Sequence, residues 1–246
     1  MEKLREQLDE LVSQLENANE LREKLDELVS MYPFNEFEFI ISHLLVAEKI
    51  SLEGYYEIRQ SYIDRNLYLN LFEISAPRSF GEIWAQGHLK ELVPLLERPT
   101  KKLDADYVGQ YDFFLPPDIK IEVKASRAVE FRSSQQLSLK ALSFDSSKNF
   151  DMNFQQIKPR YCDVFVWFGV WRDVIKCWVI PSFEVENNPY YSKGQHRGNV
   201  GEGQLHFKRN NIREFEQYLI EPSKIEETIR KAFAKEKKLR EQKCAE

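Results

Sequence analysis

The sequence has 246 residues, which predicts one sizeable domain with room for an appendage. Hydrophobic residues make up 42% and aromatic residues 13%, which indicates a folded globular chain and excludes disorder over most of the length. The 35 Lys and Arg residues and 40 Asp and Glu residues give a net charge of −5, which excludes a polybasic, histone-like binder but allows a local basic surface.

Cysteine usage and apolar runs bear on the compartment. Cys162, Cys177 and Cys244 form no closely spaced pair, which argues against a disulfide framework and against a structural zinc site. No run of about 20 apolar residues is present, so we expect no membrane span. These features together predict a cytoplasmic protein.

The first 32 residues repeat themselves, because REQLDELVS at residues 5–13 returns as REKLDELVS at residues 22–30. Leucines near a seven-residue spacing predict an amphipathic helix over residues 1–32. This segment is either a short coiled-coil dimer seam or a helix, or helical hairpin, packed on its own domain. Two more helices are expected in residues 33–75, as scaffold.

Residues 76–222 are expected to form the core. Ser79 is a plausible N-cap with Glu82 at capping-box spacing, which predicts a helix from about residue 80 to residue 97. β-rich runs on both sides of Pro116-Pro117-Asp118 predict an antiparallel hairpin.

Further along, continuous apolar runs at residues 163–171 and 174–180 predict strands that are buried on both faces. Helical patterns between and after the strands predict an α/β fold in which helices flank a mixed central sheet. Residues 187–213 are polar and contain glycine, which predicts a loop, and residues 223–246 are expected to form a charged C-terminal helix.

The candidate chemistry lies in Asp112, Glu122 and Lys124. Alternation along a strand places Glu122 and Lys124 on one side, and the hairpin returns Asp112 beside Glu122. Two carboxylates suit Mg²⁺, and an adjacent ammonium can orient a metal-bound water, as phosphodiester hydrolysis requires. Glu82 either adds a third carboxylate or only caps its helix. The alternative for the whole group is an exposed cross-strand ion pair of little energetic value.

Asp112 and, on the next strand, the run Ile-Glu-Val-Lys-Ala-Ser that contains Glu122 and Lys124 resemble the PD-(D/E)xK nuclease signature. The order of elements in residues 79–185 resembles a type II restriction endonuclease, with a helix after the E-x-K strand. The resemblance implies a mixed central sheet flanked by helices, Mg²⁺ as cofactor, a homodimer on palindromic double-stranded DNA, and a cognate DNA methyltransferase in the same system.

By the same resemblance, Asp112 and Glu122 are the metal ligands, Lys124 is the water-orienting base and Glu82 is the helix carboxylate. The sequence departs from the signature at Tyr111, which stands where the family has proline. The Pro117-Asp118 pair lies too close to Glu122 to leave room for two strands and a turn. Asp104 and Asp106 remain possible substitutes for Asp112.

We therefore expect a Mg²⁺-dependent, sequence-specific double-stranded DNA endonuclease. The alternatives are a repair or recombination nuclease of the same fold, and a non-catalytic coiled-coil interaction protein.

An acidic protein that binds DNA needs a local surface with positive and hydrogen-bonding side chains. Two polar segments are candidates, because Arg, Gln and Asn can read base edges. The alternative is that each is an ordinary solvated loop. The predicted DNA contacts are Arg127, Arg132, Ser134 and Gln135 in the first segment, and Lys193, Gln195, His196, Arg197 and Asn199 in the second.

Overall fold

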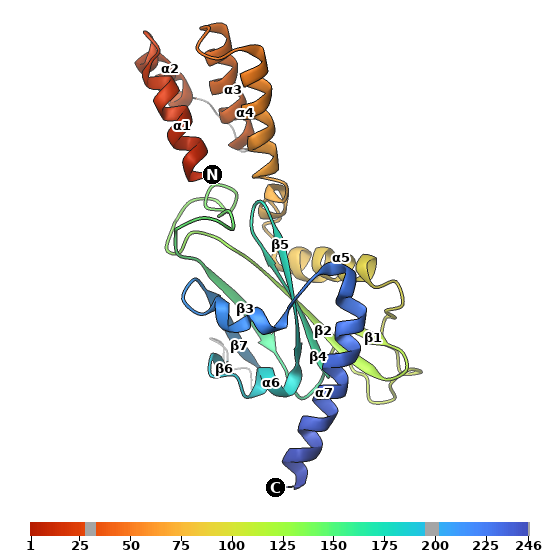
Figure 1. Ribbon diagram of the computed structural model, residues 1–246. Coiled ribbons are helices and arrows are strands. Elements are labelled where there is room, and N and C mark those ends of the chain that lie inside the picture. Colours follow the sequence, from red (N-terminus) through yellow and green to blue (C-terminus); the bar gives the residue numbers. More distant parts are fainter. Residues whose placement is uncertain (28–32, 195–201, 246) are drawn as a thin grey trace.

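The computed structural model describes residues 1–27, 33–194 and 202–245, and it shows a chain of mixed α/β class (Figure 1). The helices are α1 (Glu2–Ser13), α2 (Ala18–Glu27), α3 (Pro33–Val46), α4 (Leu52–Asp64), the 3₁₀ helix η1 (Leu69–Phe72), the π-helix η2 (Ser79–Ala85), α5 (Gln86–Leu92), α6 (Ser182–Glu186), the 3₁₀ helices η3 (Ile212–Tyr218) and η4 (Pro222–Lys224), and α7 (Ile225–Ala245). The strands are β1 (Phe113–Leu115), β2 (Ile119–Arg127), β3 (Asp151–Ile157), β4 (Val164–Val170), β5 (Ile175–Pro181), β6 (Tyr191–Lys193), β7 (Gly203–Lys208) and β8 (Leu219–Ile220).

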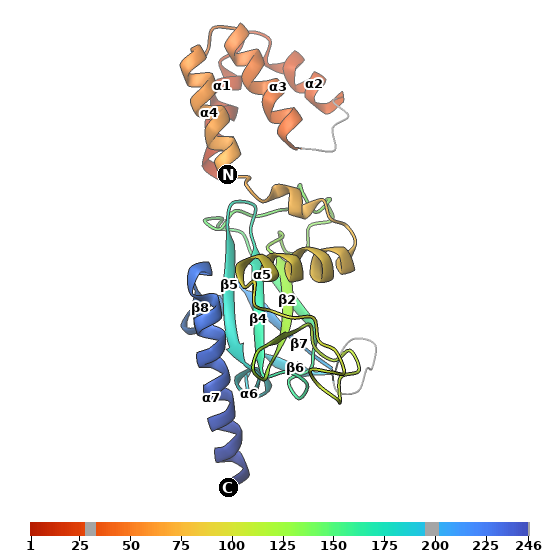
Figure 2. The ribbon, with the colours of Figure 1, turned by 90° about the vertical axis from the view of Figure 1, so that its right-hand side faces the viewer.

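Helices α1 to α4 pack around a core of their own at one end of the molecule (Figures 1 and 2). Leu4, Leu8 and Leu21 of α1 and α2 are buried together with Ile41 and Leu44 of α3. The first 27 residues therefore form a helical hairpin whose leucine stripe packs inside this four-helix unit. Within the described part of the chain, none of the helices has the length and apolarity that crossing a bilayer requires.

The main sheet has the order β1-β2-β4-β5-β8, in which β2 and β4 are parallel and the other neighbours are antiparallel. This arrangement confirms the mixed sheet, the β1–β2 hairpin and the two strands, β4 and β5, that the sequence predicts. Every residue of β4 is buried, as its continuous apolar run predicts. Helices α5 and α7 cover one face of this sheet (Figure 2), where they pack on Ile121, Val166 and Val179.

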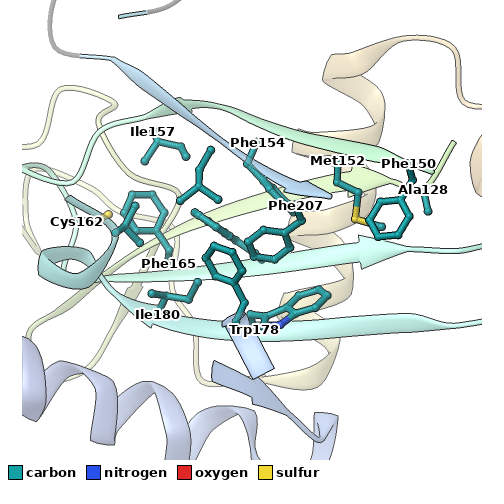
Figure 3. Close-up of a cluster of buried hydrophobic side chains, with 14 of the residues drawn as sticks. Ala128, Phe150, Met152, Phe154, Ile157, Cys162, Phe165, Trp178, Ile180 and Phe207 are labelled. Carbon is teal, nitrogen blue, oxygen red and sulfur yellow. The ribbon is translucent and has the colours of Figure 1, made fainter. Parts of the chain in front are cut away.

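A second sheet of order β3-β7-β6 covers part of the other face. Between the two sheets lies an aromatic core that includes Phe154 and Phe207 of the small sheet and Phe165, Trp167 and Trp178 of the main sheet (Figure 3). The aromatic residues that the composition provides in abundance are concentrated here, so the small sheet is held by apolar burial.

Two predictions about the segments on either side of the main-sheet strands β4 and β5 are wrong. Residues 187–194 and 202–213 contain strands β6 and β7 as well as turns, and the segment 128–150 contains turns and isolated bridges where a helix was expected. In β7, Leu205 and Phe207 are buried and alternate with Gln204, His206 and Lys208, which is the pattern of a half-buried strand. Because charged and glycine residues surround this short alternation, the sequence of the whole segment is typical of a loop.

The helix before β1 also differs from its prediction. The residue that precedes η2, Arg78, already has helical dihedral angles, so Ser79 lies inside the helical segment and no side chain caps it. The helical turns begin at Pro77, because the fixed φ of proline suits a first helical turn. The segment ends at Leu92 rather than at residue 97, because Val93 precedes Pro94, which disfavours the helical conformation, and its φ of −130° and ψ of 83° lie outside the helical region.

Candidate active site

The short strand β1 positions Asp112 beside β2. The register pairs Phe113 with Ile121, and the N–H of Asp112 donates to the Ile121 carbonyl at 3.0 Å. Two residues further along β2, the N–H of Val123 donates a hydrogen bond to Oδ2 of the Asp112 carboxylate at 2.8 Å. The hairpin that the sequence predicts therefore directs Asp112 toward the middle of β2.

Alternation along β2 separates its apolar and charged side chains. Ile121 and Val123 face the helices α5 and α7 within their apolar core. Glu122 and Lys124 face the opposite side, where the small sheet leaves the end of β2 partly uncovered. Lys124 Nζ lies 2.7 Å from Glu122 Oε1, and the two side chains are 16% and 12% exposed. This ion pair is therefore nearly buried, not the exposed pair that the structural alternative assumed.

The three side chains share one cleft of about 610 Å³. Helix η2 and the start of α5 form one wall, the β1–β2 hairpin forms the floor, and β3 forms the opposite wall. Its polar and charged lining residues are Arg78, Glu82, Gln86, Gln110, Asp112, Glu122, Lys124, Asn153, Gln155, Gln156 and Lys158. The structure thus brings together all four residues that the sequence proposes for catalysis.

Burial makes the charges of this cleft unfavourable. Burial raises the pKa of Asp112 above its ordinary value, and it raises the pKa of Glu122 to about 7, with the charge of Asp112 adding to the rise. Burial also lowers the pKa of the Lys124 ammonium, but attraction by Glu122 and Asp112 outweighs it, and this pKa lies above its ordinary value. With both acids ionised, two negative charges face one positive charge, which favours a divalent cation.

The donor set fits Mg²⁺. Among the described residues, no group of three or more His, Cys, Asp or Glu side chains is arranged to hold a metal ion. Asp112 and Glu122 offer two carboxylates instead. Mg²⁺ is commonly held by one or two carboxylates, and water and substrate phosphate complete its octahedral shell. Structural zinc sites require four protein ligands of nitrogen or sulfur type, which this cleft lacks.

Gln86 is a member of the site that the sequence did not indicate. Its Nε2 donates to Asp112 Oδ1 at 2.6 Å, and its Oε1 accepts from Arg98 at 2.6 Å. The Arg98 guanidinium also lies 4.6 Å from the centre of the Phe113 ring. Gln86 therefore fixes the second oxygen of Asp112 and is itself fixed by Arg98. The one sequence signal is its place one helical turn after Glu82, on the same face.

The remaining carboxylates are placed as follows. Glu82 lies at the mouth of the cleft, where it accepts a hydrogen bond from Arg78 at 2.6 Å, and its charge adds to the raised pKa of Asp112. Asp104 pairs with Lys120, and Asp118 pairs with Lys237 of α7. The cleft is not lined by Asp104, Asp106 or Asp118, so Asp112 is the aspartate that accompanies Glu122.

The predicted DNA contacts are placed in different surroundings. The Arg127 guanidinium donates to the carbonyls of Leu71 and Ile74, lies 4.2 Å from the centre of the Phe80 ring, and has a pKa lowered to about 10 by burial. It is therefore engaged with its own chain. The candidates exposed at the surface are Arg132, Ser134, Gln135 and Lys193. The candidates that lie outside the described residues are Gln195, His196, Arg197 and Asn199.

Comparison with known proteins adds no family to this picture. No protein-family model matches the chain, and no curated protein matches it. The functional conclusion therefore rests on the sequence motif and on the geometry of the cleft.

Proposed function

We propose that the chain is a Mg²⁺-dependent endonuclease with a restriction-endonuclease-like fold that hydrolyses phosphodiester bonds of double-stranded DNA at specific sequences. The observation that carries the proposal is the convergence of Asp112, Glu122 and Lys124 in one open polar cleft. The hairpin register and the alternation along β2 produce this convergence, so it does not depend on a single side-chain contact.

Mg²⁺ held by Asp112 and Glu122 would supply a water of lowered pKa and would neutralise charge on the phosphate. The chain's own residues prepare the site. Asp112 is oriented before substrate arrives, because Val123 and Gln86 each donate to one of its oxygens. In this proposal the Lys124 ammonium orients the attacking water. Glu82 at the mouth would supply a third carboxylate to the metal, directly or through water.

Cutting both strands of a palindrome is most simply done by two copies related by a two-fold axis, so we propose a homodimer. A restriction enzyme of this kind acts in the cytoplasm beside a methyltransferase that protects the host DNA, and we extend the proposal to both. The buried thiols of Cys162 and Cys177, which form no disulfide, suit a reducing compartment.

The test is to incubate the full chain with a mixed-sequence plasmid, with and without Mg²⁺, and to sequence the DNA ends. Discrete fragments that require Mg²⁺ and disappear in Lys124→Ala are the expected result. Continuous or structure-dependent degradation would instead indicate a repair or recombination nuclease. A chain that cleaves no DNA at any Mg²⁺ concentration would refute the proposal and favour a non-catalytic interaction protein.

A further inference from the structure

Strand β3 carries an irregularity at the wall of the cleft. Phe154 pairs with Leu205, and the next registered pair is Ile157 with Gly203. Two residues of β3, Gln155 and Gln156, therefore lie opposite one residue of β7, Gln204. This two-against-one arrangement defines a β-bulge, a feature that is over-represented beside active sites, where it redirects a side chain.

The bulge changes which side chains reach the cleft. Met152 and Phe154 face the aromatic core, so strict alternation would bury position 156 and expose position 157. The structure instead exposes both Gln155 and Gln156 and still buries Ile157. The additional residue thus adds a second amide to the cleft wall without removing an apolar side chain from the core.

Gln156 adopts an unfavourable backbone conformation. Its φ is +55°, in the left-handed region where glycine and asparagine are favoured. A bulge that served only the sheet would be better made with glycine at this position. Strained residues of this kind cluster at functional sites, so the glutamine side chain itself points to a function.

Both amides are available for a ligand. Neither Gln155 nor Gln156 makes a side-chain hydrogen bond or ion pair within the described part of the chain. Both line the cleft that contains Asp112, Glu122 and Lys124, so a molecule bound at the candidate catalytic residues passes beside them. On the neighbouring strand, Gln204 is held by a contact of 3.5 Å with Asn153.

We propose that Gln155 and Gln156 read adenine bases of duplex DNA bound in this cleft. A carboxamide presents a donor and an acceptor side by side, which match N6 and N7 of adenine at the edge of the major groove. Strand β3 lies at the edge of the small sheet β3-β7-β6, and both of its glutamines line the cleft. Carboxamides carry no charge and so contribute little to sequence-independent attraction to phosphate, which comes mainly from Lys and Arg.

This inference rests on the proposed function and adds residues for sequence discrimination that lie outside the loops predicted from the sequence. The test uses the full chain and a pool of duplexes with randomised sequence. Bound DNA is selected with the Lys124→Ala variant, and cleaved DNA is selected with the active chain in Mg²⁺. Each selection is repeated with Gln155→Ala, with the double variant Gln155→Ala/Gln156→Gly, and with Gln7→Ala, an exposed glutamine of α1, as the matched control.

The expected result is a selected motif that contains adenine, with a preference for adenine that falls about ten- to hundredfold in the double variant and is unchanged in Gln7→Ala. Glycine suits the φ of residue 156, so the double variant should fold, and its thermal midpoint verifies this. The dependence of binding on salt should stay the same, because no phosphate contact is removed.

The possible outcomes separate the two proposals. Cleavage at an identical motif in all variants would overturn the base-reading role and leave the nuclease proposal standing. Cleavage without sequence preference would overturn the base-reading role together with the sequence specificity of the proposed function, and it would favour a repair or recombination nuclease. A motif in the bound pool that the double variant loses, without any cleavage, would support base reading and overturn the nuclease proposal. Absence of any sequence preference in the bound pool would overturn base reading.

Discussion

Replacing Glu122 by glutamine removes a candidate metal ligand, and it should make the protein progressively more stable relative to the wild type as the pH rises. Glutamine has nearly the same shape as protonated glutamate, so the variant reports the free energy of ionising this carboxyl in the fold. The pKa of Glu122 is about 7 in the folded protein against an ordinary value of 4.5. At about 1.4 kcal/mol for each factor of ten in proton affinity, ionising this carboxyl costs about 3 kcal/mol more in the folded than in the unfolded chain.

The direction in which the stability changes with pH follows from proton binding. Between pH 4.5 and pH 7 the folded chain keeps a proton at Glu122 that the unfolded chain has released, so this residue lowers the stability of the wild type as the pH rises through that window. Glu122→Gln lacks this titration. Its free energy of unfolding relative to the wild type should therefore rise by about 3 kcal/mol between pH 4.5 and pH 8.

Urea unfolding of both proteins at several pH values, without divalent cations, measures this difference. Glu6→Gln, which removes the same charge from an exposed position on α1, controls for the change in net charge. A stability difference that is constant from pH 4.5 to pH 8 would refute the reasoning, because it would show that burial does not disfavour the ionised carboxylate of Glu122.

Three further predictions address the metal, the lysine and the buried amide. Mg²⁺ at about one hundred times its dissociation constant should raise the free energy of unfolding at pH 8 by about 2.7 kcal/mol, and Asp112→Asn should abolish this gain in urea titrations. Lys124→Ala should bind duplex DNA normally in a gel-shift assay but cut it at least about 100-fold more slowly, and full activity would contradict its role. Gln86→Ala should lower Mg²⁺-dependent cleavage by about 10- to 100-fold, because Asp112 loses a fixed donor. Gln110→Ala is the control, since Gln110 lines the same cleft but bonds within its own loop, and equal losses in both variants would contradict a specific role for Gln86.

The parts of the fold that the sequence predicts depend on local signals. The turn at Pro116-Pro117-Asp118 fixes the β1–β2 hairpin, and alternation along β2 then places Glu122 and Lys124 on one side. Asp112, Glu122 and Lys124 therefore meet in the structure, because one short hairpin determines all of their positions. The catalytic roles assigned to them remain predictions.

The parts that the sequence does not predict depend on pairing between distant segments. Gln86 meets Asp112 only after a helix packs against the sheet, and its one local signal, a place one helical turn after Glu82, is too common to separate it from a solvated glutamine. The bulge at Gln155 and Gln156 is defined by the register against β7, about fifty residues further along the chain. A register shift of this kind leaves no periodic pattern, since it is a break in the period.

An exposed cross-strand ion pair, which is the alternative interpretation of Asp112, Glu122 and Lys124, does not fit the surroundings of these residues. A surface ion pair is solvated and contributes little, whereas Glu122 and Lys124 are nearly buried and lie beside a second acid, Asp112. Removing ions from water is costly, and apolar residues of similar size usually stabilise a fold at least as well as a buried ion pair. The second carboxylate makes the balance worse, because with both acids ionised the group carries an excess negative charge. A role in folding alone would favour removing that charge, whereas binding a divalent cation requires it, so the surplus carboxylate is the feature that argues for a metal site.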